Sequence, residues 1–179
     1  MKRSISIVRD YSGNKIAVVH DIKFKGRQNI DWDGVETYLK QYVGEVVEIA
    51  ESKEIVYIGS DLPDEYTGSI YTAKLKGALA KAKANAAQGI LEIIEIATNK
   101  RFQENLAKKH DNNARFGWYR YDSRFAIPIL GEKGEVIWHN VFRAELVIRH
   151  SSDGKLYLYD IINIKKETGT PLKLIMPYG

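Results

Sequence analysis

Two histidines and two arginines in the segment 139–150 have the residue types that acid–base chemistry on RNA requires. His139 and His150 bracket the segment, and Arg143 and Arg149 lie between them. Metal-free RNA cleavage needs a base for the 2′-hydroxyl proton, an acid for the leaving oxygen and a cation beside the phosphate. The four residues therefore predict a catalytic site. The alternative is that both histidines lie on the surface at the two ends of one strand.

A second group of polar and aromatic residues lies in the segment 108–124. Arginine pairs with phosphate and aromatic rings stack on bases, so this mixture is typical of nucleic-acid binding. The expected contacts are Lys108, Lys109, Arg115, Trp118, Tyr119, Arg120, Tyr121 and Arg124. Residues 100–124 hold seven basic and three acidic residues, an excess that equals the formal net charge of +4 of the whole chain. The alternative is a loop whose rings anchor it to the core.

Two lysines, Lys165 and Lys166, end the last expected strand and are followed by Thr168. They are either further nucleic-acid contacts or lysines that protect a strand edge from pairing. The four histidines have no metal-ligand spacing, and the chain has no cysteine. These facts exclude disulfides and a cysteine nucleophile, and they predict no metal site and no cofactor.

The composition suits a folded, soluble protein. The chain has 179 residues, of which 44% are hydrophobic and 28% are charged. This length suits one domain with a real core, and the balanced charge argues against a mainly disordered protein. No apolar stretch approaches the roughly 20 residues of a membrane span, and the N-terminus lacks the apolar run of a signal peptide. We therefore expect a cytoplasmic protein that does not bind membranes.

Residues 1–60 are expected to form a ββαβ unit. A turn-rich cluster at 11–14 separates two apolar runs, which predicts a hairpin whose second strand extends to Ile22 and Phe24. Apolar residues at helical spacing predict a helix that begins at Asp31 or Asp33 and extends to Val46. The run 54–59 is expected to be a strand that returns beside the hairpin.

The rest of the chain is expected to change from loop to helix to strand. Proline, glycine and aspartate predict a loop over 61–69. A helical pattern covers 71–110, with helix favoured over strand at 90–97 and a basic helix over 99–110. Short apolar runs separated by glycine-containing turns then predict an antiparallel meander. Pro128 indicates an edge strand or a bulge.

The expected fold class is therefore α+β: an N-terminal ββαβ unit, central helices and a C-terminal antiparallel meander packed on the helices. The two parts, 1–60 and 61–179, form either two units or one continuous domain.

Several sequence blocks resemble a domain carried on mobile genetic elements of clostridial gut bacteria. The resemblance covers nearly the whole chain and rests on DIKFKG (21–26), IDW (30–32), YIGSDLPDEY (57–66), AKAKANAAQGI (80–90), GWYRYDSRF (117–125), LVIRH (146–150), LYLYDI (156–161) and IKKET (164–168). In its layout, with helices before an antiparallel meander, the chain is more distantly similar to the barnase/EndoU/colicin/RelE-like nucleases of phage and polyvalent proteins. That resemblance implies an activity on RNA.

These observations lead to a functional hypothesis and its rivals. We expect a mobile-element or phage accessory protein that engages RNA, with metal-independent RNA cleavage as its enzymatic form. The alternative is a non-enzymatic, anti-CRISPR-like protein that binds and inhibits a host nuclease ribonucleoprotein complex. A third candidate is a DNA-binding accessory factor, whose affinity would fall steeply with salt. The oligomeric state stays open.

Overall fold

Three long antiparallel strands in the last third of the chain form the middle of the sheet. The computed structural model describes residues 4–26, 29–103 and 114–167. The three strands are β6 (Trp118–Leu130), β7 (Val136–His150) and β8 (Leu156–Lys166). Each of the two connecting turns contains a glycine with positive φ, Gly134 or Gly154, a conformation that strains other residues. The predicted meander is confirmed.

The N-terminal strands join the same sheet at opposite sides of the meander. β1 (Ile5–Arg9) and β2 (Lys15–Val19) form the predicted hairpin, and β2 runs parallel to β6. β3 (Val46–Glu48) and β4 (Ile55–Tyr57) form a second antiparallel pair, and β4 runs parallel to β8. The strand order is β1-β2-β6-β7-β8-β4-β3. The placement of residues 54–59 beside the hairpin was therefore wrong, because three strands lie between them.

Strand β5 (Thr98–Gln103) occupies positions that the sequence assigned to a basic helix. Asn99 has a positive φ, which helical backbone does not allow. β5 pairs with positions 118–122 of β6, while β2 pairs with positions 125–126. Because β7 occupies the other edge of β6, β2 and β5 share one edge and leave a gap at Ser123 and Arg124. The remainder of the predicted helix, 104–110, lies outside the described residues.

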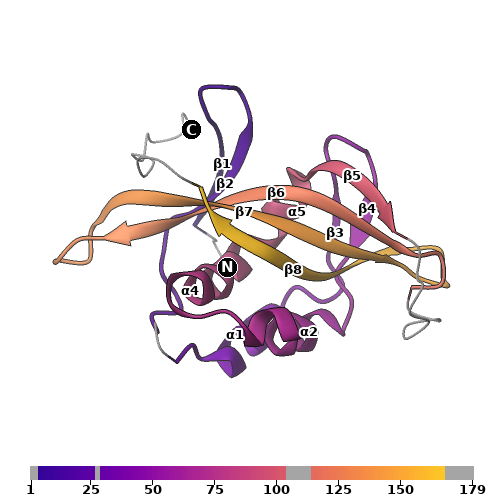
Figure 1. Cartoon of the computed structure of the whole chain (residues 1–179), viewed down its shortest axis with the longest axis horizontal. Coiled ribbons are helices and arrows are strands. Elements are labelled where there is room, and N and C mark those ends of the chain that lie inside the picture. The colour runs from indigo at the N-terminus through magenta and orange to yellow at the C-terminus, as the bar shows by residue number, and fades with distance from the viewer. Residues whose placement is uncertain (1–3, 27–28, 104–113, 168–179) are drawn as a thin grey trace.

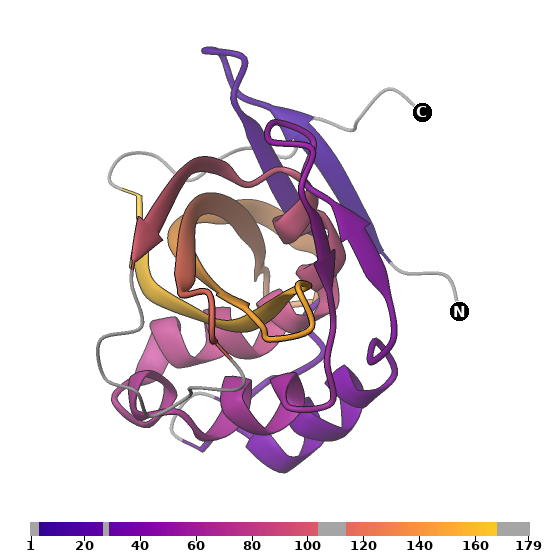
Figure 2. The ribbon, with the colours of Figure 1, turned by 90° about the vertical axis from the view of Figure 1, so that its right-hand side faces the viewer.

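The helices form a layer on one face of the strongly coiled sheet (Figure 1, Figure 2). They are α1 (Trp32–Lys40), α2 (Leu62–Gly68), α3 (Ile70–Ala73), α4 (Gly77–Ala86), a 3-10 turn (Ala87–Gly89) and α5 (Ile90–Glu95). The side chain of Asp31 caps α1 by accepting a hydrogen bond from the Gly34 N–H at 3.0 Å. The helix favoured at 90–97 is confirmed. The first helix ends six residues earlier than predicted, and Val46 begins β3 instead.

Helix α2 lies in the segment that was predicted to be a loop. Pro63 stands in its first turn, where the missing N–H is not needed. Asp64 and Glu65 also lie in that turn, where their charges interact favourably with the helix dipole. Leu62 and Tyr66 are fully buried. The proline therefore marks the start of a helix, and the loop prediction was wrong.

A buried ion pair joins the helical layer to the sheet. Lys83 Nζ of α4 lies 2.7 Å from Asp160 Oδ1 of β8, and neither side chain is more than 2% exposed. Lys83 also donates to Thr72 Oγ1 at 2.6 Å, and Ser69 Oγ donates to Asp160 Oδ2 at 2.8 Å. Burial lowers the pKa of Lys83 and raises that of Asp160, and the attraction between the two charges opposes both shifts. Helix α4 and the residue between α2 and α3 are thereby attached to β8 by polar contacts.

The predicted α+β class is confirmed, with N-terminal strands, central helices and a C-terminal meander packed on them. The main hydrophobic cluster draws on every part of the chain, including Val19, Leu39, Ile94, Phe125 and Ile161. Within the described residues, no helix is both long enough and apolar enough to span a membrane.

Replacing Lys83 with methionine should destabilise the protein by about 3–5 kcal/mol, because Asp160 would remain buried without its cation. The double variant Lys83→Met/Asp160→Asn should be more stable than Lys83→Met, since no unpaired charge is then buried. Urea unfolding followed by circular dichroism measures both effects. Equal stability of the single and double variants would show that the ion pair is not the origin of the loss.

Candidate nucleic-acid interface

His139 is buried within the fold rather than exposed in a cleft. Its side chain is fully inaccessible, and its Nε2–H donates to the Val19 carbonyl at 3.1 Å. Its ring meets the ring of His20 edge-on, with 5.7 Å between centroids. Among the described residues, His139 Nδ1 has no hydrogen-bond partner. His20 Nε2 in turn lies 2.8 Å from Ser6 Oγ. These contacts give His139 a packing role beside the end of β2.

His150 lies at the other end of β7, 11 positions from His139. At the usual rise of a strand this separation is roughly 35 Å along the chain. The ring of His150 packs on Phe116 and Tyr119, with centroids 5.0 and 6.0 Å away. The structure therefore does not bring the two histidines into one site. An acid–base pair formed by His139 and His150 is not possible in this arrangement.

The two arginines of the predicted catalytic set lie in different surroundings. Arg149 is buried, pairs with Asp61 at 3.2 Å and stacks on Tyr157, with its Cζ 4.2 Å from the ring centroid. Arg143 is exposed in the middle of β7 and lines a large groove. Only Arg143 of the four predicted catalytic residues lies in that groove.

Two arginines of the basic segment 108–124 are paired with acidic residues from elsewhere in the chain. Arg124 makes a bidentate pair with Glu167, at 2.7 and 2.9 Å, and a third contact with Asp10 at 2.8 Å. Arg120 shares the carboxylate of Glu145 with Arg101. Arg115 is exposed. Lys108 and Lys109 lie outside the described residues.

The aromatic residues of the same segment pack mainly inward. Tyr121 is buried, with 1% exposure, so its ring is not available to stack on a base. Trp118 packs edge-on against Tyr159, with 5.0 Å between ring centroids. Tyr119 is half-buried beside His150. Trp118 and Tyr121 therefore anchor this segment to the rest of the fold, as the alternative interpretation of the sequence expected.

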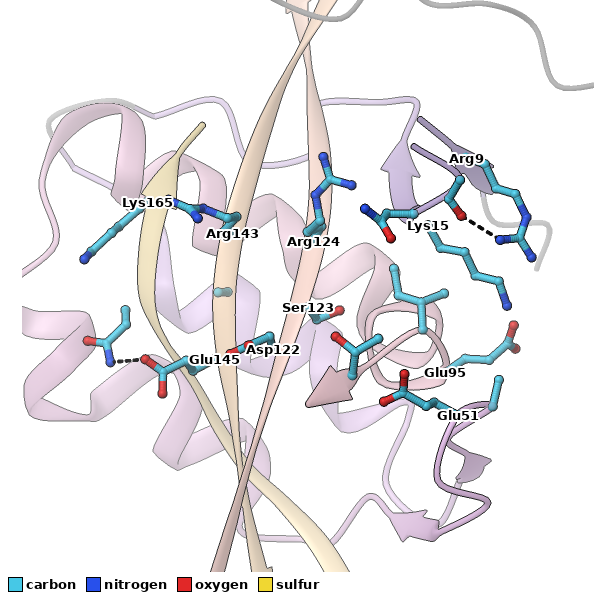
Figure 3. A pocket seen from close by; sticks show the side chains of 17 residues that line it. Arg9, Lys15, Glu51, Glu95, Asp122, Ser123, Arg124, Arg143, Glu145 and Lys165 are labelled. Atoms are coloured by element: carbon cyan, nitrogen blue, oxygen red, sulfur yellow. Dashed lines mark hydrogen bonds between the residues drawn. The ribbon is translucent and has the colours of Figure 1, made fainter. Parts of the chain in front are cut away.

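A groove of about 890 Å³ lies over the solvent face of the meander and reaches the gap between β2 and β5 (Figure 3). Side chains alternate between the two faces of a strand, so Asp122 and Arg124 of β6 and Arg143 and Glu145 of β7 point into it. One wall is basic and is formed by Arg9, Lys15, Arg124, Arg143 and Lys165. The opposite wall is acidic and is formed by Glu51, Glu95, Asp122 and Glu145. We call this feature the basic groove.

Cations face one another across neighbouring strands of the basic groove. Arg124, Arg143 and Lys165 are in register on β6, β7 and β8, and Arg9 is in register with Lys15 on the hairpin. Like charges directly opposite each other destabilise a sheet. Within the described chain, acidic side chains pair with Arg124 but with none of the other four. The groove therefore holds positive charge that an anionic ligand would neutralise.

The acidic wall is partly occupied by ion pairs. Burial alone would raise the pKa of Glu145, but hydrogen bonds from Asn163 and Arg120 and the charge of Arg101 hold the pKa below its ordinary value. Asp122 accepts hydrogen bonds from Asn99 and Arg101. Glu95 is exposed and faces the groove from the end of α5. The acidic wall thus presents carboxylate acceptors opposite the cations.

Sequence reasoning identified Arg124, Arg143 and Lys165 but missed the rest of the basic groove. Arg9 and Lys15 flank a hairpin turn, while Glu51 follows β3 and Glu95 ends α5, both far away in the sequence. The alternation of Arg120, Asp122 and Arg124 was a usable signal, because it indicates a polar face on β6. Lys166 is exposed at the end of β8 and does not line the groove.

No group of three histidine or carboxylate side chains in the described ranges is placed to hold a metal ion. Comparisons with protein-family models, curated proteins and solved structures find no match for the chain. The assignment of the site therefore depends on its own geometry.

The neutral histidine pair should make stability depend on pH. Burial lowers the pKa of His20 and of His139 from the ordinary 6.5, so the unfolded chain takes up protons first as the pH falls. The stability that the two uncharged histidines contribute is fully present above about pH 6.5 and is lost as the pH falls below this value. His139→Phe should reduce the fall in unfolding free energy between about pH 6.5 and 5.5 by up to about 1 kcal/mol. Urea unfolding at several pH values tests this, and an unchanged slope would contradict it.

Proposed function

We propose that the protein binds single-stranded RNA in the basic groove, as an accessory protein of a mobile element or phage. The observation that supports this most directly is the row of cations in register across the strands, of which Arg143 and Lys165 have no acidic partner in the described part of the chain. Phosphate groups neutralise such a row, and arginine and lysine are the residues that contact them.

The acidic wall favours RNA over a simple anion. A carboxylate repels phosphate, but it accepts hydrogen bonds from the amino groups of bases and from the 2′-hydroxyl of ribose. Glu51 and Glu95 lie opposite the cations, so a nucleotide with its phosphate on Arg143 would extend its sugar and base toward carboxylates. DNA lacks the 2′-hydroxyl donor, which makes RNA the better ligand for this wall.

We propose RNA binding only, without cleavage by a pair of histidines. His139 is buried against His20, and His150 lies beyond the groove at the end of β7. The resemblance to RNA-directed nucleases is therefore used only to predict that the ligand is RNA.

Removing two groove cations should weaken RNA binding and lower its salt dependence. In Arg143→Gln/Lys165→Gln, the slope of log affinity against log salt should fall by about 0.7 for each phosphate that the protein no longer neutralises. Fluorescence anisotropy with a short labelled single-stranded RNA measures the slope between about 50 and 200 mM salt. RNA should also bind more tightly than DNA of the same base sequence.

The matched control is Lys74→Gln/Lys76→Gln, which removes the same charge from exposed positions between α3 and α4, outside the groove. It should keep the wild-type slope. If both double variants show the same reduction in slope, the binding reflects net charge and the groove is not the site.

A second candidate function is supported by the tip of the β6–β7 hairpin, which extends beyond the helical layer (Figure 1). Leu130, Ile137 and Trp138 are 39%, 45% and 36% exposed there. Several exposed apolar side chains at one hairpin tip are typical of protein contacts, and tryptophan is frequent in their energetic centres. This feature favours the alternative of an inhibitor that binds a host nuclease ribonucleoprotein complex.

If the hairpin tip is an inhibitory contact, Ile137→Ser/Trp138→Ser should weaken capture of a purified CRISPR nuclease–guide RNA complex by about 2 kcal/mol or more. The groove variant Arg143→Gln/Lys165→Gln should bind the complex like the wild type. Biolayer interferometry measures both. If the groove variant loses capture and the hairpin variant keeps it, the contact is with the RNA of the complex instead.

A further inference from the structure

Four rings gather where β6 begins and β7 ends, outside the basic groove. We call this surface the aromatic end; it comprises Phe102, Phe116, Tyr119 and His150. Phe102 packs on Tyr119 with 5.4 Å between centroids, and Phe116 packs on His150 at 5.0 Å. Phe102 and Phe116 are nevertheless 56% and 48% exposed. Large apolar rings left in water beside each other usually mark a binding surface.

Backbone hydrogen bonds fix the turn that carries Phe116 against the end of β7. The N–H of Phe116 donates to the His150 carbonyl at 3.1 Å, and the N–H of His150 donates to the Gly117 carbonyl at 3.0 Å. Gly117 has a φ of +100°, and a Cβ at this position would lie 2.7 Å from the Phe102 ring. Glycine is therefore required for Phe102 to lie over this turn. A surface held in this way loses little conformational entropy when a ligand binds.

A small pocket of about 310 Å³ opens beside these rings. It is lined by Tyr57, Tyr119 and His150, together with Glu54 and Lys155. Lys155 Nζ lies 5.0 Å from the Tyr57 ring centroid. Lys100 Nζ lies 4.3 Å from the Tyr119 ring centroid and forms an ion pair with Glu54. The pocket therefore offers ring faces, a carboxylate acceptor and adjacent cations.

The aromatic end and the basic groove are connected by β5. Thr98 at one end of this strand lines the groove, and Phe102 near the other end belongs to the aromatic end. From Arg143 to His150 is seven positions of β7, roughly 23 Å along the strand. Side chains an odd number of positions apart point to opposite faces of a strand, so an extended single strand that contacts both Arg143 and His150 passes around the free edge of β5.

We propose that the aromatic end binds a nucleobase of the same RNA strand whose phosphates lie in the basic groove. Every base has a π-face, so stacking on Phe102, Phe116 or His150 requires no particular sequence. Lys100 and Lys155 lie close enough to the rings to contact the flanking phosphates. Glu54 provides an acceptor for an amino group on the base edge. This inference rests on RNA binding in the groove and adds the base contact to it.

The deciding experiment compares two short labelled RNAs on the full-length wild-type protein by fluorescence anisotropy. One is a complete single strand, and the other has the same phosphates but abasic ribose at every position. Stacking by one or two aromatic residues predicts that the complete RNA binds about 5- to 100-fold more tightly. Both RNAs should show the same salt slope, because they carry the same phosphates.

Replacing the exposed rings should remove the preference for bases. Phe102→Ala/Phe116→Ala should bind the complete RNA about as weakly as the wild type binds the abasic RNA, with the salt slope unchanged. The control Tyr71→Ala removes a 41% exposed ring from α3 and should change neither value. Circular dichroism verifies that each variant is folded, and the comparison of the two RNAs on the wild type needs no variant.

The outcomes separate this inference from the function on which it rests. Equal affinity of the wild type for the two RNAs, with a steep salt slope, would overturn the nucleobase site and leave groove binding intact. A salt slope unaffected by Arg143→Gln/Lys165→Gln, combined with a strong preference for complete RNA, would support the aromatic end and overturn the groove. Absence of binding to either RNA would overturn both.

Discussion

The buried pair of Lys83 and Asp160 is the contact on which the arrangement of helices and sheet depends. Both charges are out of water, and such a pair is tolerated only when each partner has further hydrogen bonds. Thr72 supplies one for the lysine and Ser69 one for the carboxylate, so residues from the loops and helices between α2 and α4 converge on β8. These contacts hold α4 against β8. The helices then cover one face of the meander, and the other face is free to form the groove.

That free face is shaped by how β6 divides its edge between two partners. β2 pairs with the second half and β5 with the first, and ion pairs lie on either side of the gap between them. Arg124 binds Asp10 from the hairpin and Glu167 from the end of β8, while Arg101 from β5 and Arg120 contact Glu145. Burial alone would raise the pKa of Asp10, but backbone hydrogen bonds and Arg124 hold the pKa below its ordinary value. These contacts tie the β1–β2 hairpin and β5 to the meander.

The sequence predicted the elements better than it predicted their partners. The hairpin, the helix over 90–97 and the meander follow from local periodicity, and all three are confirmed. Helix α2 was missed because Pro63 and Gly68 were interpreted as loop residues, although they stand at a helix start and a helix end. Strand β5 was missed because an exposed edge strand has no apolar alternation to detect. The distance between His139 and His150 was also beyond sequence reasoning, since spacing along a strand does not indicate which side chains meet.

The location of the free charge shows why a basic stretch is an unsafe guide to a binding surface. By sequence, the whole positive excess can be assigned to residues 100–124, and a local interpretation places the contact there. In the fold, arginines of that stretch meet acids from positions 10, 145 and 167, so their charges are largely balanced. Cations elsewhere are left without acids: Arg143 and Lys165 face each other on adjacent strands and have no acidic partner among the described residues. Folding leaves the net charge unchanged, but it decides where the unpaired charge lies. A ligand responds to the position of that unpaired charge, which here is the middle of the sheet.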